Sequence, residues 1–174
     1  MTAWHEEAIG KHHDRKNFDC GDAELNDFLQ KYARQSHDQG GSKSFLAVTD
    51  DGNKHILGFY SLTPTSIDPE KMPAAVRKGL GRHEVPGFRL IHLAVDRRQT
   101  GKGIGGQLML AAGRRCLRAA SEVGGVVLAI DAKNDRVAEW YKSYGAIQLV
   151  DSPLSLTISL TTMADALKAA GHML

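Results

Sequence analysis

The chain of 174 residues has little cysteine and proline, few aromatic residues and no long apolar run. Its two cysteines, Cys20 and Cys116, are too few for a disulfide framework and lack the paired spacing of a zinc site. Cys116 falls on the apolar stripe of a predicted helix, so we expect a small buried thiol there. No run approaches the roughly 20 apolar residues of a membrane-spanning helix, and the polar start lacks the apolar stretch of a secretory signal. We therefore expect a cytoplasmic protein with reduced thiols.

The chain also has little excess of charge of either sign, because its formal net charge is only +2. Composition alone therefore does not indicate a nucleic-acid partner. The length suits a full hydrophobic core and there is no internal repeat or linker, so we expect one domain over residues 1–174. The spacing of His5, His12 and His13 does not place two of them on one helix face. We interpret them as solvent-exposed and predict no metal site.

The most informative stretch is LAVDRRQTGKGIGGQLML, residues 93–110. Its first three residues read as the end of a buried strand, and apolar residues at helical spacing begin at Ile104. A basic loop rich in glycine lies between them, so several backbone N–H groups and a helix N-terminus meet at one spot, which favours a phosphate. The loop residues that we expect at this site are Arg98, Gly101, Lys102, Gly103, Gly105 and Gly106.

Two common phosphate motifs fit this loop poorly. The P-loop pattern is not met, and although Gly101, Gly103 and Gly106 have the spacing of a dinucleotide fingerprint, no early βαβ unit surrounds them. A plain surface turn is the structural alternative. We disfavour it because four glycines between a strand and a helix are costly to keep.

The rest of the chain predicts a mixed α and β order. Apolar spacing, glycines and prolines predict a helix from about 22 to 39, strands at 44–49 and 55–62, an irregular stretch at 64–81 broken by prolines, a strand at 88–95, a long helix ending at Gly124, a strand at 126–130, a helix at 135–144, one or two strands at 146–160, and a last helix at 162–171.

Two motifs resemble the GCN5-related N-acetyltransferase (GNAT) superfamily. Arg98-x-x-Gly101-x-Gly103 is similar to its pyrophosphate arm, and the segment Asn134-x-x-x-Ala138-x-x-Tyr141-x-x-x-Gly145 is similar to the family segment after the fifth strand. The resemblance implies an α/β (α+β) fold with a mixed, mostly antiparallel sheet, splayed in the middle and flanked by helices. It departs from the family at Ala146, where phenylalanine is usual.

The same resemblance implies a cofactor and roles for particular residues. The cofactor is acetyl-coenzyme A, with no metal. The backbone of Leu93 and Val95 would bind the acetyl carbonyl and the pantetheine arm, and Asn134 would contact the cofactor. Tyr141 would protonate the departing thiolate. Its structural alternative is a core aromatic beside Trp140.

A closer resemblance covers nearly the whole chain. Phe18-Asp19-Cys20-Gly21, Gly58-Phe59-Tyr60-Ser61-Leu62 and the tail around Pro153 look like the acetyltransferase toxins of bacterial type II toxin–antitoxin systems. This implies acetylation of the α-amino group of aminoacyl-tRNA, with initiator methionyl-tRNA as first choice. It also implies a ribbon-helix-helix antitoxin and operator DNA reached through the toxin–antitoxin complex, and it leaves open whether the free toxin is a homodimer.

Four cations precede the strand that feeds the glycine loop. We expect Arg77, Lys78, Arg82 and Arg89 to contact tRNA phosphates, although runs of charge are often only solvated surface. Lys31 and Arg34 are further open candidates. Two other functions stay open from sequence. One is an acetyltransferase for a small amine or a protein N-terminus, and the other is a coenzyme A-binding subunit without catalysis.

Overall fold

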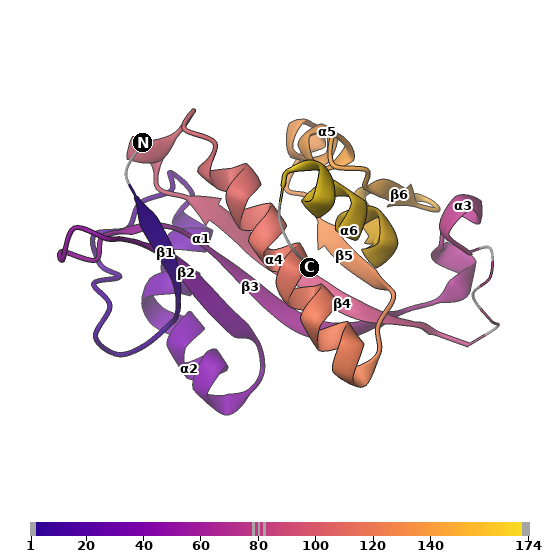
Figure 1. Cartoon of the computed structure of the whole chain (residues 1–174), viewed down its shortest axis with the longest axis horizontal. Coiled ribbons are helices and arrows are strands. Elements are labelled where there is room, and N and C mark those ends of the chain that lie inside the picture. Colours follow the sequence, from indigo (N-terminus) through magenta and orange to yellow (C-terminus); the bar gives the residue numbers. More distant parts are fainter. Residues whose placement is uncertain (1–2, 78, 80, 82, 172–174) are drawn as a thin grey trace. The chain divides into compact units, whose positions relative to one another are not determined.

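The computed structural model describes residues 3–77, 79, 81 and 83–171. Contacts within the chain group it into two compact units, Met1–Thr63 with Ile91–Met109, and Pro64–Leu90 with Leu110–Leu174. The elements (Figure 1) are β1 Trp4–Ala8, α1 Ala23–Asp27, the π-helical η1 Phe28–Tyr32, α2 Ala33–Gln39, β2 Lys43–Thr49, β3 Ile56–Ile67, the 3₁₀ turn η2 Pro69–Lys71, α3 Ala74–Arg77, β4 Val85–Val95, the 3₁₀ turn η3 Arg97–Gln99, α4 Ile104–Val123, β5 Val127–Asp131, α5 Asp135–Lys142, β6 Ile147–Leu149, β7 Ser152–Ser159 and α6 Leu160–Ala169.

The strands form a seven-stranded sheet in the order β1-β2-β3-β4-β5-β7-β6. β4 and β5 run parallel, with Gly87–Leu90 opposite Val127–Ile130. The pairs β1–β2, β2–β3, β5–β7 and β6–β7 are antiparallel. The predicted mixed, mostly antiparallel sheet with flanking helices is therefore confirmed. β4 also continues to Val95, five residues beyond Leu90, the last residue that the β5 register pairs.

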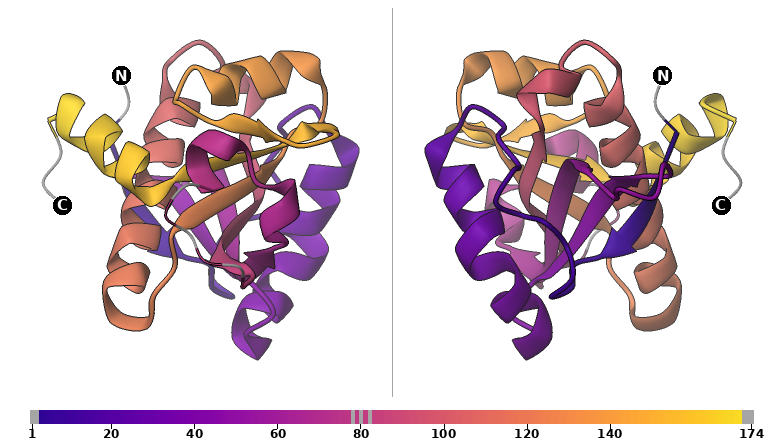
Figure 2. Two further views of the ribbon diagram at one scale, coloured as in Figure 1. Left: turned by 90° about the vertical axis from the view of Figure 1, so that its right-hand side faces the viewer. Right: turned by 90° about the vertical axis from the view of Figure 1, so that its left-hand side faces the viewer.

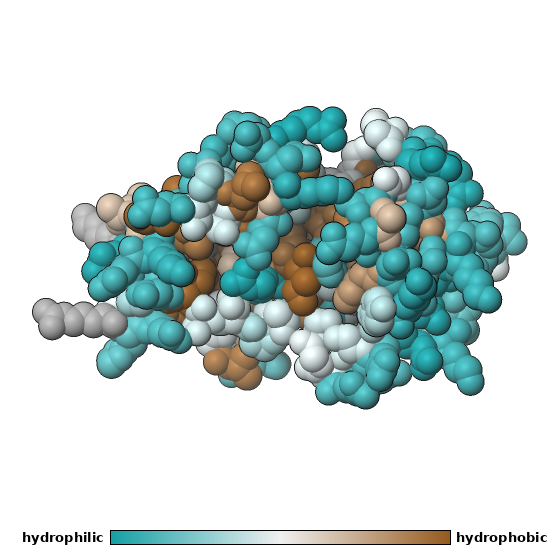
Figure 3. Space-filling view, turned by 180° about the vertical axis from the view of Figure 1, so that it is seen from behind, coloured by the Kyte–Doolittle hydropathy of each residue, from teal (hydrophilic) through white to brown (hydrophobic). Residues whose placement is uncertain are grey.

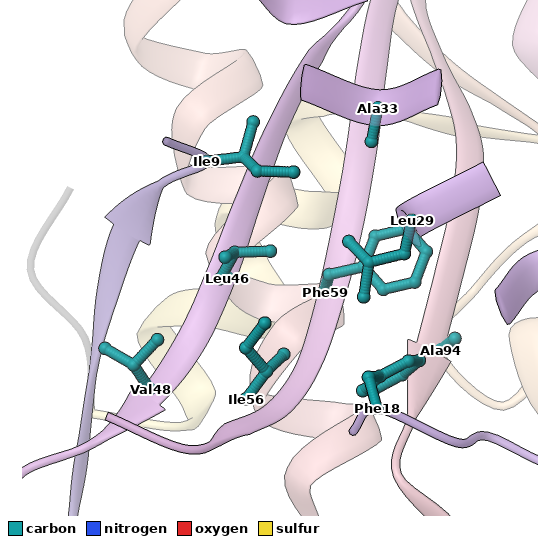
Figure 4. Close-up of a cluster of buried hydrophobic side chains, with 9 residues drawn as sticks. All are labelled: Ile9, Phe18, Leu29, Ala33, Leu46, Val48, Ile56, Phe59 and Ala94. Atoms are coloured by element: carbon teal, nitrogen blue, oxygen red, sulfur yellow. The ribbon is translucent and has the colours of Figure 1, made fainter. Parts of the chain in front are cut away.

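In the first unit, the helical run α1–η1–α2 covers one face of β2 and β3 (Figure 4). Leu29 and Ala33 from this run pack with Leu46 of β2 and Phe59 of β3 in one apolar cluster. The run begins at Asp22, whose carboxylate accepts from the Glu24 and Leu25 amides at 3.0 and 3.4 Å. It ends at Gly40, where φ is +82°. This run therefore covers the face of β2 and β3 that is opposite to the start of α4.

Gly58 sets how closely the start of α4 approaches β3. Successive residues of a strand face opposite sides, so Gly58 faces away from Phe59 and its cluster. A Cβ at Gly58 would lie 2.7 Å from the Leu108 Cδ1 of α4 and 2.8 Å from the Ala94 carbonyl oxygen of β4. The absence of a side chain therefore lets the first turns of α4 pack directly on the strands.

The second unit has its own apolar cluster, which includes Ile67, Met72, Val85, Val127 and Ala129. α3 lies beside β6 in Figure 1 and in the left-hand view of Figure 2, and the Val150 amide donates to the Lys71 carbonyl of η2 at 2.9 Å. α6 is the last element. Its N-cap is Ser159, whose hydroxyl accepts from the Thr162 amide at 3.1 Å.

Two features of the fold differ from the sequence prediction. The polar start contains a strand, β1, which pairs with β2 along one side and has exposed or half-exposed side chains. Such an edge strand lacks the apolar run that would have indicated it. Pro64 does not break β3, because the register between β2 and β3 ends at Leu62, so β2 does not need an N–H from residue 64.

Most of the surface that Figure 3 shows is hydrophilic, with hydrophobic residues reaching it in a few separate places. Among the described residues, no helix has the length and apolar character needed to cross a membrane. The large apolar side chains that are exposed are Tyr32, Val123, Ile147 and Val150.

Candidate functional site

The glycine loop is anchored where β4 ends. Asp96, the residue after β4, donates its amide to the Leu57 carbonyl of β3 at 2.8 Å. Its side chain is buried and begins the turn η3 by accepting the Arg98 amide at 2.9 Å. The carboxylate also accepts the Asp19 amide at 3.2 Å. One buried acid therefore joins the end of the strand, the loop and the segment before α1.

Arg98 closes this arrangement. Its guanidinium binds Asp96 through two hydrogen bonds, Nε to Oδ1 and Nη2 to Oδ2, both at 2.8 Å, and Nη2 also donates to the Asn17 carbonyl at 2.9 Å. Burial by itself would raise the pKa of Asp96, but the hydrogen bonds from Arg98 and from the Asp19 amide outweigh it and lower that pKa. The structure thus gives Arg98 a positioning role in the loop.

The loop that follows needs glycine at two positions. Gly101 and Gly103 have φ of +83° and +78°, in the left-handed region that favours glycine. α4 then begins at Ile104, and the Gln107 amide donates to the Gly103 carbonyl at 3.2 Å. The amides of Ile104, Gly105 and Gly106 belong to the first turn, which a helix leaves without partners from its own backbone. A helix N-terminus of this kind is where proteins commonly bind phosphate groups.

The predicted residues of the loop therefore lie together in the first unit. Leu93 and Val95 are on β4, Lys102 is exposed in the loop, and Gly105 and Gly106 are in the first turn of α4. The Lys102 ammonium donates to the Gln99 side chain at 3.2 Å. Asp96 and Asn17, which hold Arg98, were not predicted. The signal for Asp96 was its place two residues before Arg98, the spacing of an N-cap.

α5 of the second unit carries the other two predicted residues. Asn134 is the N-cap of this helix, and its Oδ1 accepts the Val137 amide at 2.9 Å. Tyr141 lies two turns further on and is 6% exposed. Its ring packs edge-on against Trp140, with 4.9 Å between the ring centroids. Asn134 therefore has a structural role as the N-cap of α5.

Tyr141 is protonated at neutral pH, as an ordinary tyrosine is, and burial raises its pKa further. Within the described part of the chain, its hydroxyl makes no hydrogen bond. A protonated phenol without a protein partner is able to donate its hydrogen to a bound ligand. The alternative interpretation of Tyr141 as a core aromatic is also compatible with its burial.

The predicted tRNA cations are in different situations. Arg77 ends α3 and is exposed. Arg89 of β4 pairs with Asp131 at the end of β5 at 2.6 Å, which offsets part of its charge. Arg89 and Asp131 line a hollow of about 190 Å³ in the second unit, together with Lys71 and Ser155. Lys78 and Arg82 lie outside the described residues.

A further group of cations lies on the helical run of the first unit. Arg15, Lys31 and Arg34 line one hollow of about 350 Å³ with Gln30 and Asp38. Lys31 pairs with Asp27 at 3.3 Å and Arg34 with Asp38 at 3.5 Å. Sequence reasoning noted Lys31 and Arg34 as open candidates for tRNA but missed Arg15, which precedes the helical run in sequence.

Two other titratable side chains prove structural. His92 of β4 packs on Phe28, with 4.1 Å between ring centroids, and burial lowers its pKa, so it is neutral at pH 7. Cys116 lies buried on the apolar stripe of α4, as predicted, and burial raises its pKa to about 12. A thiol with this pKa is not a nucleophile at neutral pH.

Known proteins resemble this chain over most of its length. The sequence matches the model described as the Acetyltransferase (GNAT) family over residues 11–146. The tRNA-acetylating toxin of Mycobacterium tuberculosis (strain ATCC 25618 / H37Rv) is 32% identical over 145 residues, which make up 83% of this chain and 85% of that protein.

Solved structures resemble the whole fold. The structure of AtaT complexed with acetyl-methionyl-tRNAfMet is 25% identical, with a TM-score of 0.87 over 93% of this chain and 98% of that one. A mutant AtaT toxin bound to the C-terminus of the antitoxin AtaR and acetyl-CoA is also 25% identical, with a TM-score of 0.78 over 92% and 95% of the two chains.

Proposed function

Because the chain belongs to the acetyltransferase (GNAT) family, we propose that it is a toxin that transfers an acetyl group from acetyl-coenzyme A to the α-amino group of aminoacyl-tRNA. The observation that carries this proposal is its similarity to the tRNA-acetylating toxin over most of both chains. Initiator methionyl-tRNA is the first choice of substrate, since the AtaT complex contains acetyl-methionyl-tRNAfMet. The cytoplasm, where charged tRNA is found, is the proposed location.

The glycine loop fits the pyrophosphate of the donor. Gly101 and Gly103 provide an exposed turn without side chains, the first amides of α4 follow it, and Lys102 adds a positive charge. We assign Leu93 and Val95 of β4 to the acetyl and pantetheine part, and Asn134 to a further contact. When bound, acetyl-coenzyme A supplies the thioester whose acetyl group is transferred.

Tyr141 is the proposed general acid. Its hydroxyl is protonated at neutral pH, so it can give a proton to a thiolate as the acetyl group leaves. The amine of an aminoacyl ester is less basic than that of a lysine side chain, so part of it is neutral near pH 7. A strong protein base is therefore not needed, which agrees with the assignment of His92 to packing on Phe28.

The cations provide the contacts to RNA. Arg77, Lys78, Arg82 and Arg89 are the proposed phosphate contacts before the acetyl site, and Arg15, Lys31 and Arg34 add a second group around one hollow beside the helical run. Each neutralised phosphate releases condensed counterions, so binding of tRNA must weaken as salt rises. This property separates the proposal from an enzyme that acetylates a small amine.

The test uses labelled acetyl-coenzyme A with four acceptors: charged total tRNA, uncharged tRNA, free methionine and a polyamine. We expect label on charged tRNA, and on N-acetyl-methionine after the ester is hydrolysed.

The double variant Arg77→Ala with Lys78→Ala should raise KM for charged tRNA and flatten its salt dependence, whereas Arg118→Ala, on the surface of α4, serves as the control. Free methionine or a polyamine reacting as well as charged tRNA would contradict the toxin assignment.

The proposed protein partner is an antitoxin of the ribbon-helix-helix type, through which the complex would reach operator DNA. The AtaT structure with the C-terminus of AtaR provides the precedent. Co-expression with the product of the adjacent reading frame should relieve growth arrest and give a stable complex. A neighbouring product that neither binds nor protects would remove this part of the proposal.

A further inference from the structure

Three histidines surround one carboxylate at the start of the chain. Glu7 lies on β1, and the turn after this strand carries His12 and His13. The Glu7 Oε1 atom lies 2.9 Å from the His13 Nε2 and 3.5 Å from the His12 Nε2. The other oxygen, Oε2, contacts His5 at 2.5 Å and Lys54 at 3.3 Å. Oε1 is thus the oxygen directed at His12 and His13.

The geometry points to a binding site for a divalent transition-metal ion of zinc's class, formed by Glu7, His12 and His13. One ligand atom from each of these residues lies within 4.8 Å of the other two. Zinc bonds of roughly 2.1 Å in a tetrahedron place ligand atoms about 3.4 Å apart. The distances from Oε1 to the two imidazole nitrogens bracket that value. Because His12 is exposed, its ring can turn to bring its nitrogen closer to that of His13.

The chemistry of the ligands favours zinc over magnesium or calcium. Two imidazoles and one carboxylate are a ligand set of catalytic and regulatory zinc sites, whereas Mg²⁺ and Ca²⁺ prefer oxygen ligands alone. Three protein ligands leave a fourth position for water. The His12 side chain is 62% exposed, so the ion has access from solvent, whereas the His13 side chain is fully buried and its ring is held in place.

The other nitrogen of His13 has the partner that a metal-bound imidazole requires. Its Nδ1 lies 3.3 Å from the Gly10 carbonyl oxygen, which can accept its N–H when Nε2 binds an ion. Without the ion, Nδ1 accepts the Gly10 amide at 2.9 Å and Nε2–H donates to Glu7. Binding therefore moves the imidazole proton from Nε2 to Nδ1, and the Gly10 amide, which would then face an N–H, must turn away from the ring.

The prediction from sequence was wrong for His13, which is buried rather than solvent-exposed. That prediction considered helical spacing alone. The residues here belong to a strand and a turn, and they meet because the turn folds back on β1. The site shares no residue with those proposed for acetyl transfer, and a bound ion would tie the edge strand β1 to the following turn.

The experiment uses the full chain without a histidine tag, stripped with a chelator and dialysed. Zn²⁺ is titrated in competition with a chromogenic chelator, and Mg²⁺ is tested separately. We expect one zinc per chain, no competition from Mg²⁺, and a higher melting temperature with zinc because the ion binds the folded state. Since loss of an outer-sphere partner alone costs about 10–100-fold in affinity, His12→Ala and Glu7→Gln should each weaken binding at least tenfold.

His55→Ala is the matched control, because His55 is an exposed histidine of the same unit outside the cluster. Its zinc affinity should equal that of the wild type. His12 is exposed, so its variant should keep the wild-type circular dichroism spectrum and remain informative even where Glu7→Gln is less stable. Equal zinc affinity in the wild type and His12→Ala, or the same loss in His55→Ala, would overturn the site.

Discussion

Asp96 and Arg98 form the pair of side chains on which the glycine loop depends. Asp96 is 1% exposed and accepts hydrogen bonds from the Arg98 side chain, the Arg98 amide and the Asp19 amide. A family motif marks Arg98 as a contact for phosphate, but in this structure its guanidinium also neutralises a buried carboxylate. Loss of Arg98 is therefore expected to affect stability as well as binding.

Arg98→Ala should lower the free energy of unfolding, because it leaves two hydrogen-bond acceptors of the buried Asp96 carboxylate without their partner. Arg98→Lys should recover only part of this loss, since lysine cannot form the two parallel bonds of a guanidinium. Urea unfolding of the three proteins at pH 7 measures the difference. An unfolding free energy of Arg98→Ala equal to the wild type's would show that the pair contributes nothing.

The same pair has a defined pH dependence. The hydrogen bonds hold the pKa of Asp96 below its ordinary value of 3.8, so its contribution to stability is present above that value and is lost as pH falls through the lower pKa of the folded state. The difference in stability between wild type and Arg98→Ala should be constant above about pH 5 and shrink below about pH 4. A difference that grows toward acid pH would contradict this sign.

Tyr141→Phe tests the proposed general acid. The change removes one oxygen from a buried ring, so the fold and the affinity for acetyl-coenzyme A should persist, while turnover on charged tRNA should fall by about 10²–10⁴-fold. Tyr144→Phe is the matched control, because Tyr144, like Tyr141, packs against Trp140, with 5.1 Å between the ring centroids. A fast Tyr141→Phe enzyme would mean that water or another group protonates the thiolate.

At the scale of elements, the loop between β4 and α4 combines a backbone conformation with an electrostatic site. Gly103 directly precedes α4, and its positive φ would be tolerated by aspartate or asparagine at a modest cost. The two residues have similar shape and differ in charge. Comparing them separates the effect on the backbone from the effect on an anion at the helix N-terminus.

Gly103→Asp should therefore abolish binding of acetyl-coenzyme A, whereas Gly103→Asn should retain a large part of it, with similar losses of stability in both. Calorimetry with acetyl-coenzyme A and thermal unfolding of both variants provide the measurements. The reason is that a carboxylate repels the pyrophosphate at the positive end of the α4 dipole. Unchanged affinity in a folded Gly103→Asp variant would remove the loop from the cofactor site.

At the scale of the whole molecule, the single domain expected over residues 1–174 stays a prediction, because contacts divide the chain into two units. The chain's two tryptophans offer a test, since Trp4 belongs to the first unit and Trp140 to the second. In Trp140→Phe the fluorescence reports the first unit, and in Trp4→Phe it reports the second.

If the chain is one domain, the fluorescence transition in each variant should coincide with the loss of circular dichroism in urea, because a single domain unfolds cooperatively. The two variants need not have the same midpoint, since Trp4 also donates to Gln107 at 3.0 Å and its loss costs stability. Fluorescence and circular dichroism that separate within one variant would instead show two domains that unfold independently.

The sequence by itself determined the features that depend on neighbouring residues. Strand, glycine loop and helix could be read from residues 93–110, because local backbone preferences and apolar spacing set those elements. The hairpin of β2 and β3, the helix α5 and the buried Cys116 on α4 follow from the same kind of signal and are confirmed. The motifs in two of these segments predicted the family, which is also confirmed.

The tertiary structure decided which distant residues meet. Arg98 with Asn17, Arg89 with Asp131, and Glu7 with His13 are pairs that strand pairing and the folding back of loops bring together. No periodicity within a segment encodes such contacts, because they depend on register and on the packing of other elements. For the same reason β1 escaped detection, since an edge strand is stabilised by its partner β2 more than by its own apolar residues.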